Sequence, residues 1–332
     1  MRRARDLAIM FSLFASLLGC APVIKAPGPS DFQPHLADDA ILTPDGARLP
    51  MRDWLPEGEP TAVVVALHGM NDYSHAFEGP GRFLAARGIA VYAYDQRGFG
   101  QAPDVGYWPG VPAMADDLDT AIALVGAKHP GKPLYVLGES MGGAVAMVAL
   151  SRPGAPKVAG VILSAPAVWG RDVMPLLNRA TLWMASYTLP WLTLTGHGLN
   201  IHPSDNVEML RALSRDPLVI KETRVDTIHG MCDLMDAAEE AAPLLHVPTL
   251  ILGGEHDEII PPEASRRVMG RLPNNPVPQV KAIYPNGWHM LLRDLQAEVV
   301  LTDIDAWIAH PQQPLPSGAD RRAVEVLAKE RN

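Results

Sequence analysis

Short, almost continuously apolar segments alternate along most of this sequence with longer, helix-like segments. The apolar segments are rich in β-branched residues, which is typical of parallel strands covered on both faces. We expect strands at residues 61–67, 89–95, 133–137, 158–164, 249–253 and 279–284, and helices near residues 75–87, 114–129, 141–151, 262–270 and 293–309. Asp45-Gly46 lies between two short extended segments and predicts a hairpin turn at the edge of the sheet. The order of the elements predicts an α/β fold with a mainly parallel central sheet and helices on both faces.

One long stretch interrupts this alternation. Between Ser164 and about Cys232 there is no clean strand, although apolar clusters occur at residues 182–184 and 189–192. A segment of this length in a compact fold is normally functional rather than a simple connection. We therefore expect a helical cap at residues 167–232, inserted over the carboxyl edge of the sheet between two core segments, 41–166 and 233–310. The polar tail at residues 311–332 is expected to add little to the core.

The first twenty residues have the layout of a secretory signal. Arg2, Arg3 and Arg5 precede an apolar run at residues 7–18 that is too short to span a bilayer, and small residues and Cys20 follow. The sequence Leu-Leu-Gly-Cys that ends at Cys20 resembles the bacterial lipoprotein signal, in which cleavage precedes a lipid-carrying cysteine.

This resemblance implies a signal peptide at residues 1–19, lipidation at Cys20 and a tether at residues 20–40. It implies an exported protein anchored to a membrane of the bacterial cell envelope. Ala21 after the cysteine favours the outer membrane. A plain signal peptide and an uncleaved anchor are the alternatives.

Composition and charge exclude several classes of function for this chain. Hydrophobic residues make up 48% of the chain and charged residues 20%, which is ordinary for a globular protein. The formal net charge of −9 gives no basic surface for nucleic acid, so that partner is excluded. With only two cysteines, Cys20 and Cys232, no disulfide framework is expected, and Cys232 is expected to be a buried, unreactive side chain.

The central chemical motif is Gly138-Glu139-Ser140-Met141-Gly142. The five-residue pattern is weak alone, but here an apolar strand ends at Gly138 and a helix of small apolar residues begins after Ser140. A sharp strand-to-helix turn requires small flanking residues, because the serine backbone is strained and neighbouring chains approach closely. Ser140 is therefore the candidate nucleophile, at a helix N-terminus that favours a developing negative charge.

A serine nucleophile requires a base and an acid that orients the base. After a turn of this type they follow in the order Asp or Glu, then His, in loops after later strands. The strand at residues 249–253 leads into Glu255, Asp257 and Glu258, and the strand at 279–284 leads into His289. We therefore predict His289 as the base and Asp257, in a Gly-x-x-Asp pattern, as the acid. Glu255 and Glu258 are the alternatives, because a shift of one residue at the strand end changes which carboxylate points inward.

An oxyanion requires two backbone N–H donors. Met141, directly after the serine, is predicted to supply one, and Met70, in the loop after the strand at residues 61–67, the other. His68 is expected to hold that loop. Asp95 and Arg97, after the next strand, are expected to form a loop-stabilising ion pair rather than to take part in catalysis.

With these residues assembled, the chain resembles the monoacylglycerol lipase and lysophospholipase branch of the α/β-hydrolase fold, the serine aminopeptidase-like group. The resemblance spans about residues 42–310. It depends on His68-Gly69, Asp95-x-Arg97-Gly98-x-Gly100, Gly138-x-Ser140-Met141-Gly142-Gly143, Gly254-x-x-Asp257 and His289. The chain departs from the family after Gly100, where the family often continues with Ser-x-Gly and this chain begins a proline-bearing loop.

The resemblance implies an α/β-hydrolase that cleaves lipid-type monoesters through an acyl-enzyme on Ser140, without a metal or an organic cofactor. A carboxylesterase, a thioesterase or a peptidase with the same residues stays an alternative. So does a lipid-anchored, non-catalytic binding module on a hydrolase scaffold.

Overall fold

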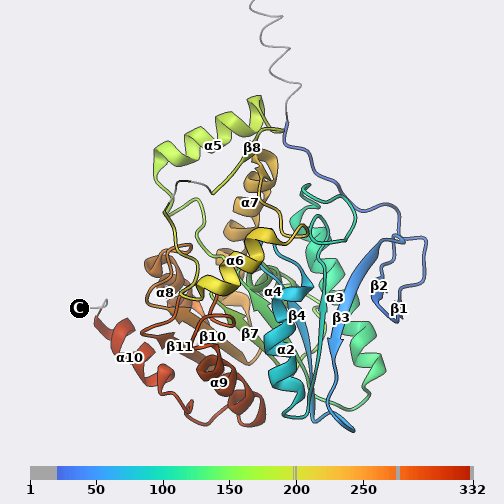
Figure 1. Cartoon of the computed structure of the whole chain (residues 1–332), viewed down its shortest axis with the longest axis vertical. Helices are drawn as coiled ribbons and strands as arrows, with labels where there is room; N and C mark the ends of the chain where they lie inside the picture. Colours follow the sequence, from blue (N-terminus) through green and yellow to red (C-terminus); the bar gives the residue numbers. More distant parts are fainter. Residues whose placement is uncertain (1–20, 197, 199, 274–276, 330–332) are drawn as a thin grey trace, which may run out of the picture.

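The computed structural model describes residues 21–196, 198, 200–273 and 277–329. Its main strands are β1 (His35–Ala37), β2 (Ala40–Leu42), β3 (Arg48–Trp54), β4 (Ala62–Leu67), β5 (Ile89–Tyr94), β6 (Leu134–Glu139), β7 (Gly160–Ser164), β10 (Thr249–Gly254) and β11 (Gln279–Tyr284). In the described chain they form one nine-stranded sheet in the order β1-β2-β3-β5-β4-β6-β7-β10-β11 (Figure 1). Pairing is antiparallel from β1 to β5 and parallel from β5 to β11. The predicted mainly parallel sheet is confirmed.

The central parallel strands are mostly apolar because both of their faces are covered. In β4, Val63, Val65 and Leu67 point to one layer of the core, whereas Val64 and Ala66 point to the other. The expected hairpin turn joins β2 to β3, where Gly46 has a φ of 78° that disfavours any residue with a side chain.

Helices cover both faces of the sheet, as predicted (Figure 1). One face carries α3 (Val111–Lys128), α4 (Met141–Ser151), α7 (Val225–Ala241), η2 (Ala242–Leu244) and α8 (Pro262–Arg271), and the other carries η1 (Ser74–Phe77), α2 (Glu78–Ala85) and α9 (Ala297–Ala309). The helix expected from residue 293 begins only at Ala297. Before it, the Asp294 carboxylate accepts hydrogen bonds from the Trp288 amide and the Ser204 hydroxyl, so this segment forms part of a loop instead.

The predicted cap contains α5 (Leu176–Thr188), β8 (Thr193–Leu194), α6 (Val207–Arg215) and β9 (Thr223–Arg224). β8 and β9 pair as a small antiparallel sheet. The structure differs at the boundary expected at Cys232, which lies inside α7. This helix packs on α4, and its residues Met231, Leu234 and Met235 are buried in the main core. The cap therefore ends before α7.

The C-terminal tail packs against the core, contrary to expectation. Leu315, Ala319 and Ala323 are buried, and α10 (Ala319–Lys329) lies along the edge strand β11. Ala319 and Ala323 are four residues apart and share one face of α10, and Leu315 precedes the helix. Because the tail is polar overall, its narrow apolar face was not recognised from the sequence.

The N-terminal segment is docked on the body rather than free along its whole length. Ile24 pairs with Trp108 in an isolated β-bridge, and the Val23 amide donates to Asp226 at 3.3 Å. The stretch expected to be a tether also contains β1. The signal peptide at residues 1–19 and Cys20 lie outside the described residues. Among the described residues, no helix has the length and apolar character required to cross a membrane.

Candidate active site

Ser140 lies at a sharp turn between β6 and α4. Its backbone has a φ of 52° and a ψ of −113°, a strained conformation for a residue with a side chain. The turn is possible because two chains approach it closely. A Cβ on Gly142 would lie 2.2 Å from the Leu67 carbonyl oxygen, and one on Gly138 would lie 2.5 Å from the Gly142 backbone. The Ser140 amide donates to the Ser164 carbonyl at 2.9 Å, which joins the turn to β7.

A chain of hydrogen bonds connects Ser140, His289 and Asp257. The Ser140 Oγ atom lies 2.9 Å from His289 Nε2, and His289 Nδ1 lies 2.9 Å from Asp257 Oδ2. The carboxylate only accepts, so Nδ1 carries the proton and Nε2 is free to accept from the serine hydroxyl. The other oxygen of Asp257 accepts from the amides of Ile259 and Ile260, each at 2.9 Å, which fixes the carboxylate.

The two alternative carboxylates point elsewhere. Glu255 accepts from Arg322 of α10 at 2.9 Å, and Glu258 accepts from the His202 amide of the cap at 2.6 Å. The neighbouring His256 stacks on Trp288, with ring centroids 5.3 Å apart. Of the acidic residues in this loop, Asp257 is therefore the one in contact with His289.

His289 is buried, and its surroundings set its basicity. Burial alone lowers the pKa of the imidazole, but the charge and hydrogen bond of Asp257, together with the charge of Glu139, raise the pKa above its ordinary value. Arg293 opposes this increase. The net effect suits a group that must accept a proton.

The loop after β4 lies against the serine. A Cβ on Gly69 would be 3.4 Å from the Ser140 Cβ, and Met70 follows directly. His68 holds this loop, as expected: its Nε2 accepts from the Gln96 amide at 3.0 Å, so its Nδ1 carries the proton and donates to the Gly69 carbonyl at 2.8 Å. Burial lowers the pKa of His68, which keeps the ring neutral.

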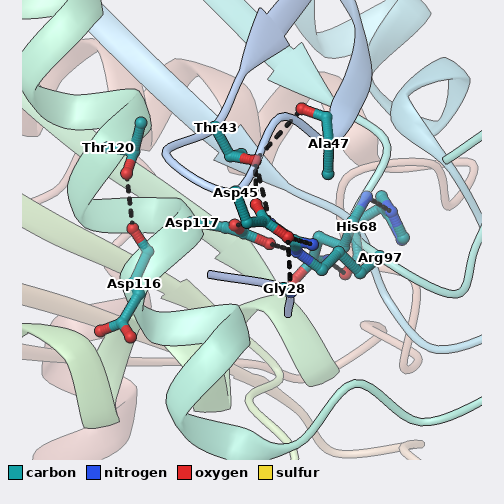
Figure 2. A network of polar contacts seen from close by, with 10 residues as sticks. Gly28, Thr43, Asp45, Ala47, His68, Arg97, Asp116, Asp117 and Thr120 are labelled. Carbon is teal, nitrogen blue, oxygen red and sulfur yellow. Dashed lines mark hydrogen bonds and ion pairs between the residues drawn. The ribbon is translucent and has the colours of Figure 1, made fainter. Parts of the chain in front are cut away.

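The predicted ion pair between Asp95 and Arg97 is wrong, although both residues do stabilise loops. Asp95 accepts from the amides of Ser74 and Gln101, each at 2.9 Å. Figure 2 shows that Arg97 instead extends between Asp45, in the β2–β3 turn, and Asp117 of α3. Each of these side chains is taken up by partners far along the chain, which the sequence pattern does not reveal.

The cap is joined to the loops of the site along two seams. In the first seam, at residues 202–206, the Met290 amide donates to the Pro203 carbonyl at 3.0 Å. In the second seam, at residues 216–223, the Ile220 amide donates to the Asn71 carbonyl at 2.9 Å and Asn71 donates to Thr223. Ser140 lies beneath this cover and is only 9% exposed.

Comparison with known proteins places this geometry in a family. The profile of the family described as serine aminopeptidase, S33, matches residues 58–296, which is more than half of the chain. The chain belongs to this family. It is 27% identical over 276 residues to the monoacylglycerol lipase of Mycolicibacterium smegmatis, with 79% of this chain and 93% of that protein covered.

Two further S33-family comparisons agree. The chain is 27% identical over 293 residues to the human monoglyceride lipase, covering 83% of this chain and 90% of the relative. The crystal structure of the Paleococcus ferrophilus monoacylglycerol lipase superposes with a TM-score of 0.63 at 26% identity, covering 78% of this chain and 98% of that chain. The predicted α/β-hydrolase fold and family are thereby confirmed.

Arg293 belongs to this S33-family site but was not predicted. Its guanidinium lies between Asp72 and Glu139, with distances of 2.7 and 2.9 Å to their oxygens. It also lines a groove of about 470 Å³ between α6, α2 and α9, whose lining includes neither Ser140 nor His289. The sequence signal that could have revealed it is the acidic Glu139 inside an otherwise apolar strand end.

Cys232 is poorly suited to act as a second nucleophile. The Cys232 thiol is buried, and burial raises its pKa to about 11, so it is not a nucleophile at neutral pH. No cluster of three or more His, Cys, Asp or Glu side chains suited to a metal ion occurs in the described ranges.

Proposed function

We propose that this protein is a serine hydrolase that cleaves carboxylic esters of lipid type, with Ser140 as nucleophile, His289 as base and Asp257 as orienting acid. The observation that carries the proposal is the hydrogen-bonded chain Ser140–His289–Asp257, at 2.9 Å for each contact, on a strained strand-to-helix turn. The family membership and the names of the relatives support the same chemistry.

In the first half of the reaction, the Ser140 Oγ attacks the ester carbonyl while its proton passes to His289 Nε2. The carbonyl oxygen then carries a negative charge, and the amides of Met70 and Met141 donate to it. Met141 begins α4, whose partial positive charge adds to this stabilisation. The carbon–oxygen bond to the alcohol breaks as His289 gives its proton to the leaving alkoxide, which leaves an acyl group on Ser140.

In the second half, His289 takes a proton from water, and the hydroxide attacks the acyl carbonyl. The same two amides hold the second oxyanion, and the bond to Ser140 breaks as His289 returns the proton to Oγ. Asp257 stabilises the imidazolium in both halves and holds its ring in the required orientation. The acid product leaves, and the resting hydrogen-bonded chain is restored.

The cap supports a lipid substrate. Its large apolar side chains are unusually exposed: Leu176 is 77% and Leu177 is 75% exposed, and Trp183, Met184 and Trp191 are all more than half exposed. Water-soluble proteins rarely leave so many large apolar side chains together in solvent without a function. An acyl chain or a lipid surface in contact with this part of the cap would cover them.

The N-terminus supports a membrane location for this activity. We propose that the chain is exported, that residues 1–19 are removed and that Cys20 carries the lipid, which anchors the protein in a membrane of the bacterial cell envelope, the outer membrane being favoured. The described chain begins at the end of the molecule that carries α5 and β8 (Figure 1). The Val23 amide donates to Asp226, which follows β9 of the cap by two residues, so the described chain starts close to the cap.

The activity is tested by labelling with a fluorophosphonate probe, which reacts with activated serines. We expect wild-type protein to be labelled and a folded Ser140→Ala variant not to be. A panel of monoacylglycerols and lysophospholipids of increasing acyl length should then show turnover that requires Ser140. A folded wild type that is neither labelled nor active on any ester would support the non-catalytic binding module. Faster cleavage of peptide amides than of esters would make it a peptidase.

The anchor is tested by producing the full chain in a bacterial host fed an alkyne fatty acid. We expect the label on the wild type and its recovery with the membrane fraction. A Cys20→Ser variant should lose the label. Unlabelled wild-type protein released in soluble form from the periplasm would refute lipidation at Cys20 without affecting the proposed activity.

A further inference from the structure

Arg293 joins three loops that meet at the serine. It follows His289 by four residues, and its side chain is only 11% exposed. One terminal nitrogen, Nη1, lies 2.7 Å from Asp72 Oδ2, and the other, Nη2, lies 2.9 Å from Glu139 Oε2. Both carboxylates are nearly inaccessible, with side-chain exposures of 8% and 3%. A single guanidinium therefore connects the loop after β4, the serine turn and the loop of the base.

Each of the two carboxylates belongs to a residue two positions away from one of the proposed oxyanion donors, Met70 and Met141. Asp72 is two residues after Met70, and its amide donates to the Gly69 carbonyl at 3.3 Å, so a tight turn connects it to that donor. Its Oδ1 atom accepts from the Tyr73 amide, which fixes the carboxylate to the loop. Glu139 is two residues before Met141, with only Ser140 between them.

The cluster is costly to bury, so a purely structural role explains it poorly. A buried ion pair is often no more stabilising than well-packed apolar residues of similar volume. Burial raises the pKa of Glu139, and the adjacent Arg293 acts against that increase. Among the described residues, Glu139 Oε1 and Arg293 Nε have no hydrogen-bond partner.

We propose that Arg293 is a positioning residue that sets the separation of the Met70 and Met141 amides. This inference depends on the proposed ester hydrolysis. The planar guanidinium presents its two terminal nitrogens in a fixed fork, so it holds both carboxylates at a fixed distance from each other. Because oxyanion donors act when charge develops in the transition state, a change in their separation lowers turnover more than substrate binding.

The principal test is Arg293→Lys, which keeps the positive charge but replaces the fork with one flexible ammonium group. With a short-chain p-nitrophenyl ester, we expect kcat to fall about 10- to 100-fold, because misplacement by 1 Å costs about 100-fold. KM should change less than about threefold, as expected for an interaction made in the transition state.

The matched control is Arg152→Lys. Arg152 also bridges two carboxylates, Asp116 and Asp119, but it follows the C-terminal end of α4, the end opposite to Ser140. We expect its kcat to remain within about twofold of the wild type, since surface ion pairs contribute little. Equal losses in the two variants would contradict the proposal.

A second variant covers the case in which Arg293→Lys does not fold. Asp72→Asn keeps the shape of the side chain and weakens the ion pair between Arg293 and the loop that carries Met70. We therefore expect kcat to fall with KM unchanged. If Arg293 acts through Asp72, the two changes are not additive: the double variant should be no slower than Arg293→Lys alone. Additive losses, or a wild-type kcat in folded Arg293→Lys or in folded Asp72→Asn, would overturn the inference.

Labelling with the fluorophosphonate probe separates this inference from the proposed function. Arg293→Lys and Asp72→Asn should both be labelled completely, only more slowly, because Ser140 and His289 are intact. A wild type that the probe does not label refutes the proposed function and this inference with it.

Discussion

Gly142 offers a direct test of how tightly the serine turn is built. An alanine at this position would place its Cβ 2.2 Å from the Leu67 carbonyl oxygen and 2.6 Å from the Leu67 carbonyl carbon. Because both are backbone atoms of the central strand β4, neither can rotate away. The closest comfortable carbon–oxygen contacts in proteins are about 3.3 Å, so α4 and β4 must separate by roughly 1 Å.

This separation has two consequences of predictable size. Overpacking of a tight interior typically costs about 1–3 kcal/mol, and we expect the upper end because rigid backbone lies on both sides. Leu67 leads directly into His68, Gly69 and Met70. A displacement of about 1 Å in this loop is expected to lower turnover about 100-fold.

Gly126→Ala is the matched control, since Gly126 also lies within a helix, α3. A Cβ there would meet only the Leu134 Cδ1 atom, at 3.7 Å, which is an ordinary contact. Alanine should stabilise this helix by about 0.5–1 kcal/mol. Urea unfolding and ester turnover of both variants provide the assay. Equal stability of the two variants, with Gly142→Ala turnover within threefold of the wild type, would refute the reasoning.

Three further outcomes follow from the same contacts. Asp257→Asn should lower kcat about 10⁴-fold, whereas Glu258→Gln, as its control, should retain most activity; the reverse result would reassign the acid. Since His289 must be neutral to accept a proton, kcat/KM should fall as pH drops through its pKa. Because Asp257 raises that pKa, the inflection should lie above the ordinary value for a histidine in the wild type and at lower pH in Asp257→Asn. A midpoint that stays in place would contradict this electrostatic account. Arg97→Met leaves the buried Asp117 and the partly buried Asp45 without their cation and should lower the free energy of unfolding by about 3–5 kcal/mol. Denaturant titration would measure this loss, and a loss under 1 kcal/mol would contradict the account.

The strands of the core could be predicted from the sequence because the parallel strands are covered on both faces. Continuous apolar runs such as the one in β4 result directly from that burial. The tail was misjudged for the opposite reason: α10 buries only one face, and its small alanines add little to mean hydropathy. Helix starts were also imprecise where side chains of the site capture backbone groups, as at Asp294 before α9.

The candidate site was readable where the chemistry dictates residue type and chain order, as for Ser140, Asp257 and His289. Contacts between loops that are distant in the sequence could not be predicted in this way. Arg97 was paired with its neighbour Asp95 because sequence proximity was the only information at hand, whereas its partners lie 52 and 20 positions away. Arg293 was missed because its partners lie 221 and 154 positions away, and the acidic Glu139 at an apolar strand end indicates only that some cation is required, not which one.

The two seams between the cap and the site loops divide the cap into parts that differ in how well they tolerate substitution. Residues near Pro203 and Ile220 are hydrogen-bonded to the loops that carry His289 and Met70, so substitutions there that move the backbone also disturb the chemistry. The α5 helix packs on α7 instead and lies outside both seams. Its side chains can therefore diversify while the catalytic loops stay in place. Substitutions on the exposed face of α5 can change the surface that the cap presents without moving the loops that carry His289 and Met70.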